Sequence, residues 1–345
     1  MSIHSRFKTA AACLLGPLLI GLAANQAVAA ESLKVGYLPV TGQAKFFVAK
    51  EYGLFEKEGL DVELIEFQNS ADGLNALVSG KLDLAPFGTT APLAHLAKGT
   101  KIRIIGGVMG GDVALVAKPE KAGELSKIAN FKGKKVATIR LSTGDAVLRG
   151  VLKDAGLDWK TDLELFELKN PAAVIEAVKS GQVDAGVVWG PHDLRAEDQG
   201  LKIISRSTDL QPGHPCCRIL AMDDKVKNKA ATLEKFIRAV LLAQKYGVEH
   251  PKETVAAIAK YVKLDPALLA RAYASPNLDQ SSDPNTQGVR HFAGVMVESG
   301  FVDKAPDLKT GIFTPIYERA LARLAQENPN DPFWKTLQDE FKQKN

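Results

Sequence analysis

The sequence has no apolar run that reaches the roughly 20 residues needed to span a bilayer. The longest run, residues 9–24, follows a short basic start and is succeeded by small residues before Glu31. This arrangement is typical of a secretory signal peptide, and it predicts one over residues 1–30, cleaved after Ala29 or Ala30. We therefore expect an exported, periplasmic protein rather than a membrane-spanning one.

Cysteine is almost absent, with three residues in a chain of 345. Cys13 lies inside the expected signal peptide and would leave with it. The two that remain, Cys216 and Cys217, are adjacent. No disulfide can then link distant parts of the mature chain, so the fold must rest on apolar cores.

The chain also lacks a strong excess of either charge. It holds 44 Lys and Arg against 40 Asp and Glu, a formal net charge of +4. Arg6 and Lys8 would leave with the signal peptide and no acid would, so 42 basic residues would face the same 40 acidic ones. Such a balance gives no strong attraction to polyanions. We expect no nucleic-acid partner.

Signatures of the common enzyme classes are missing as well. The sequence has no GxSxG elbow, no Walker loop, no HExxH, and no GxGxxG after a strand. Most of its histidines are scattered without the spacing of metal ligands. We therefore expect a binding protein that carries no cofactor.

What the chain does contain is two series of short apolar strands that alternate with helical segments. This alternation favours an α/β fold with mostly parallel sheets flanked by helices. After residue 226 the pattern becomes almost wholly helical. The expected strands are 33–40, 61–67, 81–88 and 101–110 in the first series, and 134–140, 163–170, 183–190 and 201–207 in the second.

The two series contain an internal repeat. Residues 76–88, ALVSGKLDLAPFG, align with residues 177–190, AVKSGQVDAGVVWG, so that Asp83 corresponds to Asp184. Phe87 and Trp189 each precede the glycine that ends its segment, so we expect them to take equivalent places near the ends of their strands. Together with the shared element order, the repeat predicts two similar lobes with a chain that crosses between them twice.

Ligands of open parallel sheets bind beyond the carboxyl ends of the strands, where helices begin. The small polar and aromatic residues found there suit a small-molecule cleft. Ser and Thr at such places could equally cap helices, and the aromatic residues could belong to the cores. Arg140 could clamp an oxyanion or pair with Asp145. The candidates are Thr41, Gln43, Phe87, Thr89, Thr90, Met109, Arg140, Ser142, Thr143, Gly144, Asp145, Trp189 and His192.

Several phrases resemble a known family when read in order: GLFEKEGLDVE, the SGxxD repeat, and FKGKKVA. They are similar to periplasmic substrate-binding proteins of ABC importers, in the branch that binds aliphatic sulfonates, taurine, nitrate and thiamine pyrimidines. The resemblance implies capture of a small anionic or sulfur-containing solute, without chemistry. It also implies a monomer that delivers its solute to a membrane permease with a cytoplasmic ATPase.

The resemblance further implies a two-lobed periplasmic binding protein fold with two hinge crossovers, at ALVAKP (114–119) and CRILAM (217–222). Lobe one would then span residues 31–115 and 220–345, and lobe two residues 116–219. Closure of the two lobes around the solute would be a hinge motion.

The stretch GHPCC departs from this family pattern just before the second crossover. His214, Cys216 and Cys217 should lie at the floor or rim of the cleft. Four interpretations stay open: a vicinal disulfide, a soft-metal site completed by a ligand, direct contact with a sulfur-containing or otherwise soft molecule, and inert packing. A further alternative is an enzyme similar to the fungal thiamine-pyrimidine synthase, which shares the fold and has a cysteine-rich iron motif.

Overall fold

The computed structural model describes residues 1–2 and 30–345. The expected signal peptide therefore lies, apart from its ends, outside the described residues, and so do Ala29 and Cys13. Within the described part of the chain, no helix is both long and apolar enough to cross a membrane.

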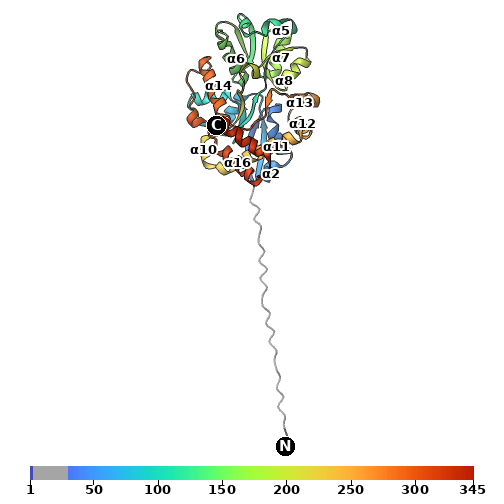
Figure 1. Ribbon diagram of the computed structural model, residues 1–345, viewed down its shortest axis with the longest axis vertical. Coiled ribbons are helices and arrows are strands. Elements are labelled where there is room, and N and C mark those ends of the chain that lie inside the picture. The colour runs from blue at the N-terminus through green and yellow to red at the C-terminus, as the bar shows by residue number, and fades with distance from the viewer. Residues whose placement is uncertain (3–29) are drawn as a thin grey trace.

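The molecule has two lobes, stacked in Figure 1, and each lobe is built on a sheet flanked by helices. Lobe two, drawn in green and yellow, holds a five-stranded sheet of order β7-β6-β8-β5-β9. Its strands are β5 (Val113–Ala117), β6 (Lys135–Ile139), β7 (Glu164–Leu168), β8 (Ala185–Trp189) and β9 (Lys202–Arg206). Its helices are α5 (Pro119–Leu125), the 3-10 turn η2 (Ile128–Phe131), α6 (Thr143–Asp154), α7 (Pro171–Ser180), α8 (His192–Asp198) and α9 (Ser207–Leu210).

Lobe one joins the N-terminal segment to the whole C-terminal third of the chain. Its four-stranded sheet has the order β11-β4-β10-β3, and a bridge from Val35 to Leu84 attaches the parallel pair β1-β2. The strands are β1 (Glu31–Tyr37), β2 (Leu60–Glu66), β3 (Ala85–Gly88), β4 (Ile102–Gly111), β10 (Pro215–Met222) and β11 (Leu278–Asp279).

The helices of lobe one come from both ends of the mature chain. Phe55 and Phe236 stack at a centroid distance of 5.3 Å, which ties an early helix to the longest late one. The helices are η1 (Thr41–Gln43), α1 (Ala44–Glu51), α2 (Leu54–Lys57), α3 (Ser70–Val78), α4 (Thr90–Ala97), α10 (Asp223–Asn228), α11 (Ala230–Glu249), α12 (Pro251–Tyr261), α13 (Pro266–Tyr273), α14 (Thr286–Glu298), α15 (Leu308–Gly311), α16 (Pro315–Glu327) and α17 (Pro332–Lys344).

Both lobes use the same strand order, which confirms the α/β class. Counted outward from β2, lobe one runs β2-β1-β3-β10-β4, and lobe two runs β7-β6-β8-β5-β9. The fourth position in each sheet is taken by an antiparallel strand, β10 in lobe one and β5 in lobe two. The sheets are therefore mixed, because each incoming strand runs against its neighbours.

The segments expected to be hinges lie inside the two sheets. Val113–Ala117 pairs with β8 and β9 of lobe two, and Pro215–Met222 pairs with β3 and β4 of lobe one. The chain therefore changes lobe a few residues earlier than the expected crossovers, at 111–112 and between α9 and β10. At the first crossing, Asp112 adopts a left-handed backbone with φ of 65°.

The repeated aspartates have the same role in both lobes. Asp83 Oδ2 accepts from the amide of Lys34 at 2.9 Å, and Asp184 Oδ2 accepts from the amide of Lys135 at 2.8 Å. Each carboxylate also pairs with a lysine from the helix that follows the antiparallel strand, Lys225 for Asp83 and Lys121 for Asp184. The aspartate of the internal repeat thus links the first and third strands of each lobe. We call this aspartate with its amide and lysine partners the Asp–Lys lock.

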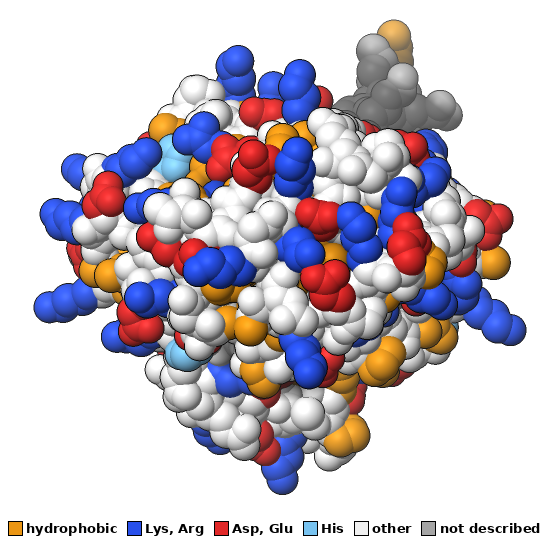
Figure 2. All heavy atoms as spheres, turned by 90° about the horizontal axis from the view of Figure 1, so that it is seen from above, with side chains coloured by type: hydrophobic (Ala, Val, Ile, Leu, Met, Phe, Trp, Pro, Cys, Tyr) orange, Lys and Arg blue, Asp and Glu red, His pale blue; other side chains and the backbone are white. Residues whose placement is uncertain are grey.

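Charged side chains of both signs are interspersed over the face seen in Figure 2, with apolar ones scattered among them. This mixture agrees with the near balance of acidic and basic residues in the sequence.

Candidate functional site

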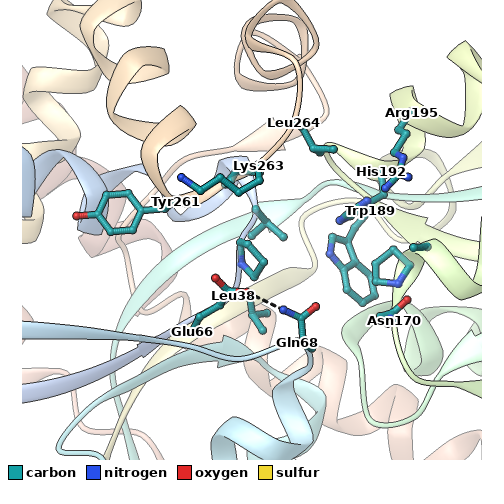
Figure 3. A pocket seen from close by; sticks show the side chains of 15 residues that line it. Leu38, Glu66, Gln68, Asn170, Trp189, His192, Arg195, Tyr261, Lys263 and Leu264 are labelled. Atoms are coloured by element: carbon teal, nitrogen blue, oxygen red, sulfur yellow. Dashed lines mark hydrogen bonds between the residues drawn. The ribbon is translucent and has the colours of Figure 1, made fainter.

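A cavity of about 250 Å³ lies between the lobes, at the carboxyl ends of strands from both sheets. We call it the outer cavity (Figure 3). Lobe one contributes the loop after β1, the end of β2 and the turn after α12, whereas lobe two contributes the ends of β7 and β8 and helix α8. Its walls are formed by Leu38, Pro39, Val40, Glu66, Gln68, Asn170, Pro171, Ala172, Trp189, His192, Arg195, Tyr261, Val262, Lys263 and Leu264.

The charged groups of the outer cavity are two cations and one carboxylate. Arg195 lies in the wall from lobe two, and Lys263 lies in the wall from lobe one, where its Nζ donates to the carbonyl of Lys260. Glu66 is held by the Tyr37 hydroxyl at 3.1 Å and by Gln68 Nε2 at 2.6 Å. The carboxylate therefore already has partners, and the balance of free charge in the cavity is positive.

One further feature, the start of helix α7, favours an anion in this cavity. Asn170 caps helix α7 by accepting from the amide of Ala173, so the positive end of that helix faces the cavity wall. The indole of Trp189, which is 9% exposed, faces the open space beside it. Burial and the neighbouring Arg195 lower the pKa of His192 to about 4, so its imidazole is neutral at neutral pH.

A second, smaller cavity of about 20 Å³ shares Leu38, Val40 and Trp189 with the outer one. We call it the inner recess. Its lining is apolar apart from hydroxyl and sulfur groups. The remaining lining residues are Ser70, Gly88, Met109, Val113, Ser142, Thr143, Gly144, Cys216 and Cys217.

The beginnings of α4 and α6, one from each lobe, meet at the backbone carbonyl of Cys216. That oxygen accepts from the Thr89 amide at 2.9 Å, from Thr89 Oγ1 at 3.1 Å and from Thr143 Oγ1 at 2.6 Å. The Thr89 amide also lies 3.2 Å from Thr143 Oγ1. Thr89 and Thr143 therefore hold the lobes together beside the inner recess.

The two cysteines face the inner recess as free thiols, so the vicinal disulfide is not present. Their Sγ atoms lie 3.9 Å apart, and both residues are buried. The adjacent Cys217 thiol and burial raise the pKa of Cys216 well above its usual value. Both residues line the inner recess, which adjoins the outer cavity.

Phe87 lies in the core of lobe one and lines neither cavity. A Cβ at Gly73 would collide with its ring, which also packs edge-on to Phe67. The expected equivalence of Phe87 and Trp189, which rests on the glycine after each, is wrong, because the paired strands place Phe87 one residue earlier. Leu84 bridges β1 as Ala185 pairs with β6, so counting onward matches Phe87 to Val188 and Gly88 to Trp189.

Three other candidates from the first series lie in the walls behind the cleft. Gln43 links the amide of Leu38 to the carbonyl of Pro86, a structural bridge. Thr41 and Thr90 are fully buried and line neither cavity. These polar residues therefore shape the loops that carry the site.

Arg140 and Asp145 line a third cavity, of about 410 Å³, on another side of the lobe interface. They do not pair with each other. Asp145 accepts from Arg149 Nε at 2.9 Å, whereas Arg140 is exposed and lies 3.8 Å from Glu167. Arg140 is thus not positioned to clamp a solute in the outer cavity. Ser142 caps α6 by accepting from the amide of Asp145 at 3.1 Å and also lines the inner recess.

His214 is buried away from both cavities. Its Nδ1 lies 2.9 Å from the carbonyl of Gln211, and its ring packs against Phe292. The imidazole therefore does not join the two thiols, and the expected three-residue metal set is not assembled. In the described part of the chain, no group of three or more His, Cys, Asp or Glu side chains could hold a metal ion.

Sequence reasoning missed much of the outer cavity. Glu66 and Gln68 follow a strand end and could have been found by the rule that gave the other candidates. Arg195 lies one turn into α8, and residues 261–264 lie in a turn between helices. No strand-end rule reaches that turn, because only the return of the C-terminal helices brings it to the cleft.

The model of the NMT1-like family matches residues 26–263. A putative binding protein of Brucella abortus is 27% identical over 241 residues, which cover 69% of this chain and 73% of that protein. A putative aliphatic sulfonates-binding protein of Escherichia coli is 27% identical over 301 residues, covering 84% of this chain and 92% of that protein.

Solved structures share the fold. The periplasmic nitrate-binding protein NrtA from Synechocystis PCC 6803 superposes with a TM-score of 0.75 at 18% sequence identity. The match covers 88% of this chain and 92% of that one. The two-lobed periplasmic binding protein fold predicted from the sequence is therefore confirmed.

Proposed function

Because the chain belongs to the NMT1-like family, we propose that it is the solute-binding component of an ABC importer of the sulfonate and nitrate type. In this proposal it is exported with its signal peptide removed after Ala29 or Ala30. It works in the periplasm as a monomer and delivers its solute to a membrane permease driven by a cytoplasmic ATPase. The two lobes, whose boundaries lie a few residues before the expected 31–115 with 220–345 and 116–219, close around the solute.

The observation that carries this proposal is the outer cavity between the lobes. Both lobes contribute walls to it, so a bound solute would bridge them and favour the closed arrangement over an open one. A volume of about 250 Å³ limits the solute to a small molecule.

The chemistry of the walls favours a small organic anion such as a short sulfonate. Arg195 and Lys263 offer positive charge from opposite walls, and the start of α7 adds its dipole. Trp189 and Leu264 offer apolar surface to a short carbon chain. The names of the Escherichia coli and Synechocystis relatives, which refer to sulfonates and nitrate, support an anionic solute.

The test is a calorimetric titration of the mature protein, freed of co-purified solute by unfolding and refolding. The panel contains taurine, short alkanesulfonates and nitrate. We expect one site per chain for a sulfonate, and loss of at least about 100-fold in affinity for Trp189→Ala, because a large buried contact disappears.

A matched control is Trp159→Ala, which removes a tryptophan outside both cavities. Its solute affinity should stay within a few-fold of that of the parent. Absence of binding for every member of the panel would overturn the proposed solute class. Equal affinity of the parent and the Trp189 variant would exclude the outer cavity as the site.

A further inference from the structure

Three sulfur-containing side chains line the inner recess: the two cysteines of the mature chain, Cys216 and Cys217, and Met109. The register between β10 and β4 shifts on both sides of Cys217, and Cys216 has no partner residue on β4. Such a bulge re-aims neighbouring side chains, which normally alternate between the faces of a sheet. Both thiols therefore enter one recess, where Met109 is the cross-strand partner of Cys217.

The spacing of the thiols matches two ligands on one metal ion. A metal–thiolate bond is about 2.3 Å long, so two sulfur atoms at tetrahedral to trigonal angles lie about 3.8–4.0 Å apart. The Sγ atoms of Cys216 and Cys217 are 3.9 Å apart. The recess has a volume of about 20 Å³, which is enough for one metal ion or one water molecule.

The recess offers sulfur and almost nothing else to a metal. Among the described residues no imidazole or carboxylate lines it, and its oxygen-bearing side chains are the hydroxyls of Ser70, Ser142 and Thr143. The sulfur of Met109 packs against Gly42, where a Cβ would collide with Sδ. Two thiolates with one thioether are soft ligands that select Cu(I) over harder divalent cations.

Two buried basic side chains lie behind the thiols: Arg218, and Lys45, whose pKa is lowered to about 7 by burial. Arg218 donates to the carbonyls of Cys217 at 2.7 Å and of Met109 at 3.4 Å, and its Nε has no partner among the described residues. Lys45 Nζ donates to the carbonyl of Val108. In the described part of the chain neither side chain forms an ion pair with a carboxylate, although Asp279 and Asp283 lie farther off. Unpaired buried charge is costly, so these side chains favour an anion nearby.

We propose that the Sγ atoms of Cys216 and Cys217 and the Sδ atom of Met109 form a binding site for Cu(I). Each thiol loses one proton as its bond to Cu(I) forms, and no electron is transferred. The product, one Cu(I) on two thiolates and a thioether, carries one negative charge, which Arg218 and Lys45 offset. The site goes beyond the proposed solute-binding function, because it uses only the inner recess and leaves the outer cavity for the solute.

The experiment is a titration of reduced mature protein with Cu(I) in the absence of oxygen, against bicinchoninate as a competing chelator. We expect one Cu(I) per chain by native mass spectrometry, and X-ray absorption that shows sulfur ligands only. Because two protons leave per ion, the affinity should rise with pH, by up to about 100-fold per pH unit.

Variants assign the ligands. Cys216→Ser and Cys217→Ser should each abolish binding of Cu(I) in competition with the chelator, and Met109→Leu should weaken it by at least about 10-fold. Met222→Leu is the matched control, since Met222 lies on the same strand but lines neither cavity. Its Cu(I) affinity should equal that of the parent. Thermal unfolding of each variant shows whether it remains folded, and Met109→Leu keeps the test decisive if a serine variant does not fold.

Several outcomes would overturn the site. These are no displacement of the chelator, nitrogen or oxygen ligands in the absorption spectrum, unchanged binding in the cysteine variants, or tighter binding of Zn(II) than of Cu(I). Sulfonate titration on the same preparation separates the two proposals. Solute binding without Cu(I) binding removes the metal site alone, whereas Cu(I) binding without solute binding removes the proposed solute.

Discussion

The two lobes share a scaffold but differ where the solute would bind. Strand order, the antiparallel incoming strand and the Asp–Lys lock recur in both. At the end of the third strand, however, Gly88 of lobe one corresponds to Trp189 of lobe two. A Cβ at Gly88 would come 3.0 Å from Ser70 Oγ and 3.1 Å from Thr143 Oγ1. Lobe one thus has little room for a side chain at this position, whereas lobe two carries an aromatic wall at its equivalent.

One residue of offset explains the different fates of Phe87 and Trp189. Successive side chains of a strand point to opposite faces, so a shift by one residue exchanges core and cleft. Phe87 therefore packs inside lobe one, against space left by Gly36 and Gly73. The comparison teaches that the repeat preserves the strands, while the functional side chains come from one lobe at a time.

The largest expected effect is a difference in the stability lost when Phe87 and Trp189 are each replaced by alanine. Phe87→Ala should lower the free energy of unfolding by about 3–5 kcal/mol, because it leaves a cavity in a closed core. Trp189→Ala should cost less stability, since part of its ring already faces an open cavity. Urea unfolding of both variants measures the difference. Equal losses would contradict the distinct placements.

The next effect should be the same in both lobes. Asp83→Ala and Asp184→Ala should each cost about 1.5–3 kcal/mol, because each removes an ion pair and a hydrogen bond to a backbone amide. Although burial acts to raise their pKa values, the lysine and amide partners outweigh it and lower the pKa of both carboxylates. This stability should be lost as the pH falls through the folded-state pKa.

Unfolding of the two single variants and of the double variant measures this equivalence. The losses should add, because the two sites lie in different lobes and share no partner. If only one of the two variants lost stability, the Asp–Lys lock would have the same geometry in both lobes but would stabilise only one of them.

A smaller effect, an increase in the free energy of unfolding, is expected for a substitution of Asp112, where the chain first crosses between the lobes. Burial and the neighbouring Asp193 raise the pKa of Asp112 well above its usual value. The folded state therefore holds a proton that the unfolded chain releases, so this group lowers stability as the pH rises above about 4. Asp112→Asn should be more stable than the parent by about 1 kcal/mol or more at pH 7. The gain should vanish near pH 4 in urea unfolding.

The smallest effects concern the cations on the two walls of the outer cavity. Arg195→Gln and Lys263→Gln should each weaken binding of a sulfonate about 2–5-fold, because partly exposed charges are screened by solvent. The loss should shrink at high salt. Calorimetry at two salt concentrations measures it. A variant on one wall that abolishes binding would show that a single lobe supplies the anion contact.

The sequence predicts the scaffold better than the site. Short apolar strands, the SGxxD repeat and the element order sufficed for the two lobes. Met109, Ser142, Thr143, Gly144, Trp189, His192, Cys216 and Cys217 were placed at the cleft by the strand-end rule and by the position of GHPCC. Lys263 and its neighbours could not be found, because a distant helical segment brings them there. The partners of Arg140 and Asp145 could not be predicted either, because several charged residues compete for each of them, and only the fold brings Glu167 to Arg140 and Arg149 to Asp145.

The insertion of β10 into lobe one has a consequence for how the chain folds. Lobe two is formed by one continuous stretch, so all its strand pairings join residues that are synthesised close in time. The sheet of lobe one has a gap between β3 and β4 until residues 215–222 are available. Non-local pairings of this kind slow folding, because a long loop must close first. We expect lobe two to acquire its structure first and lobe one to be completed around its returning strand.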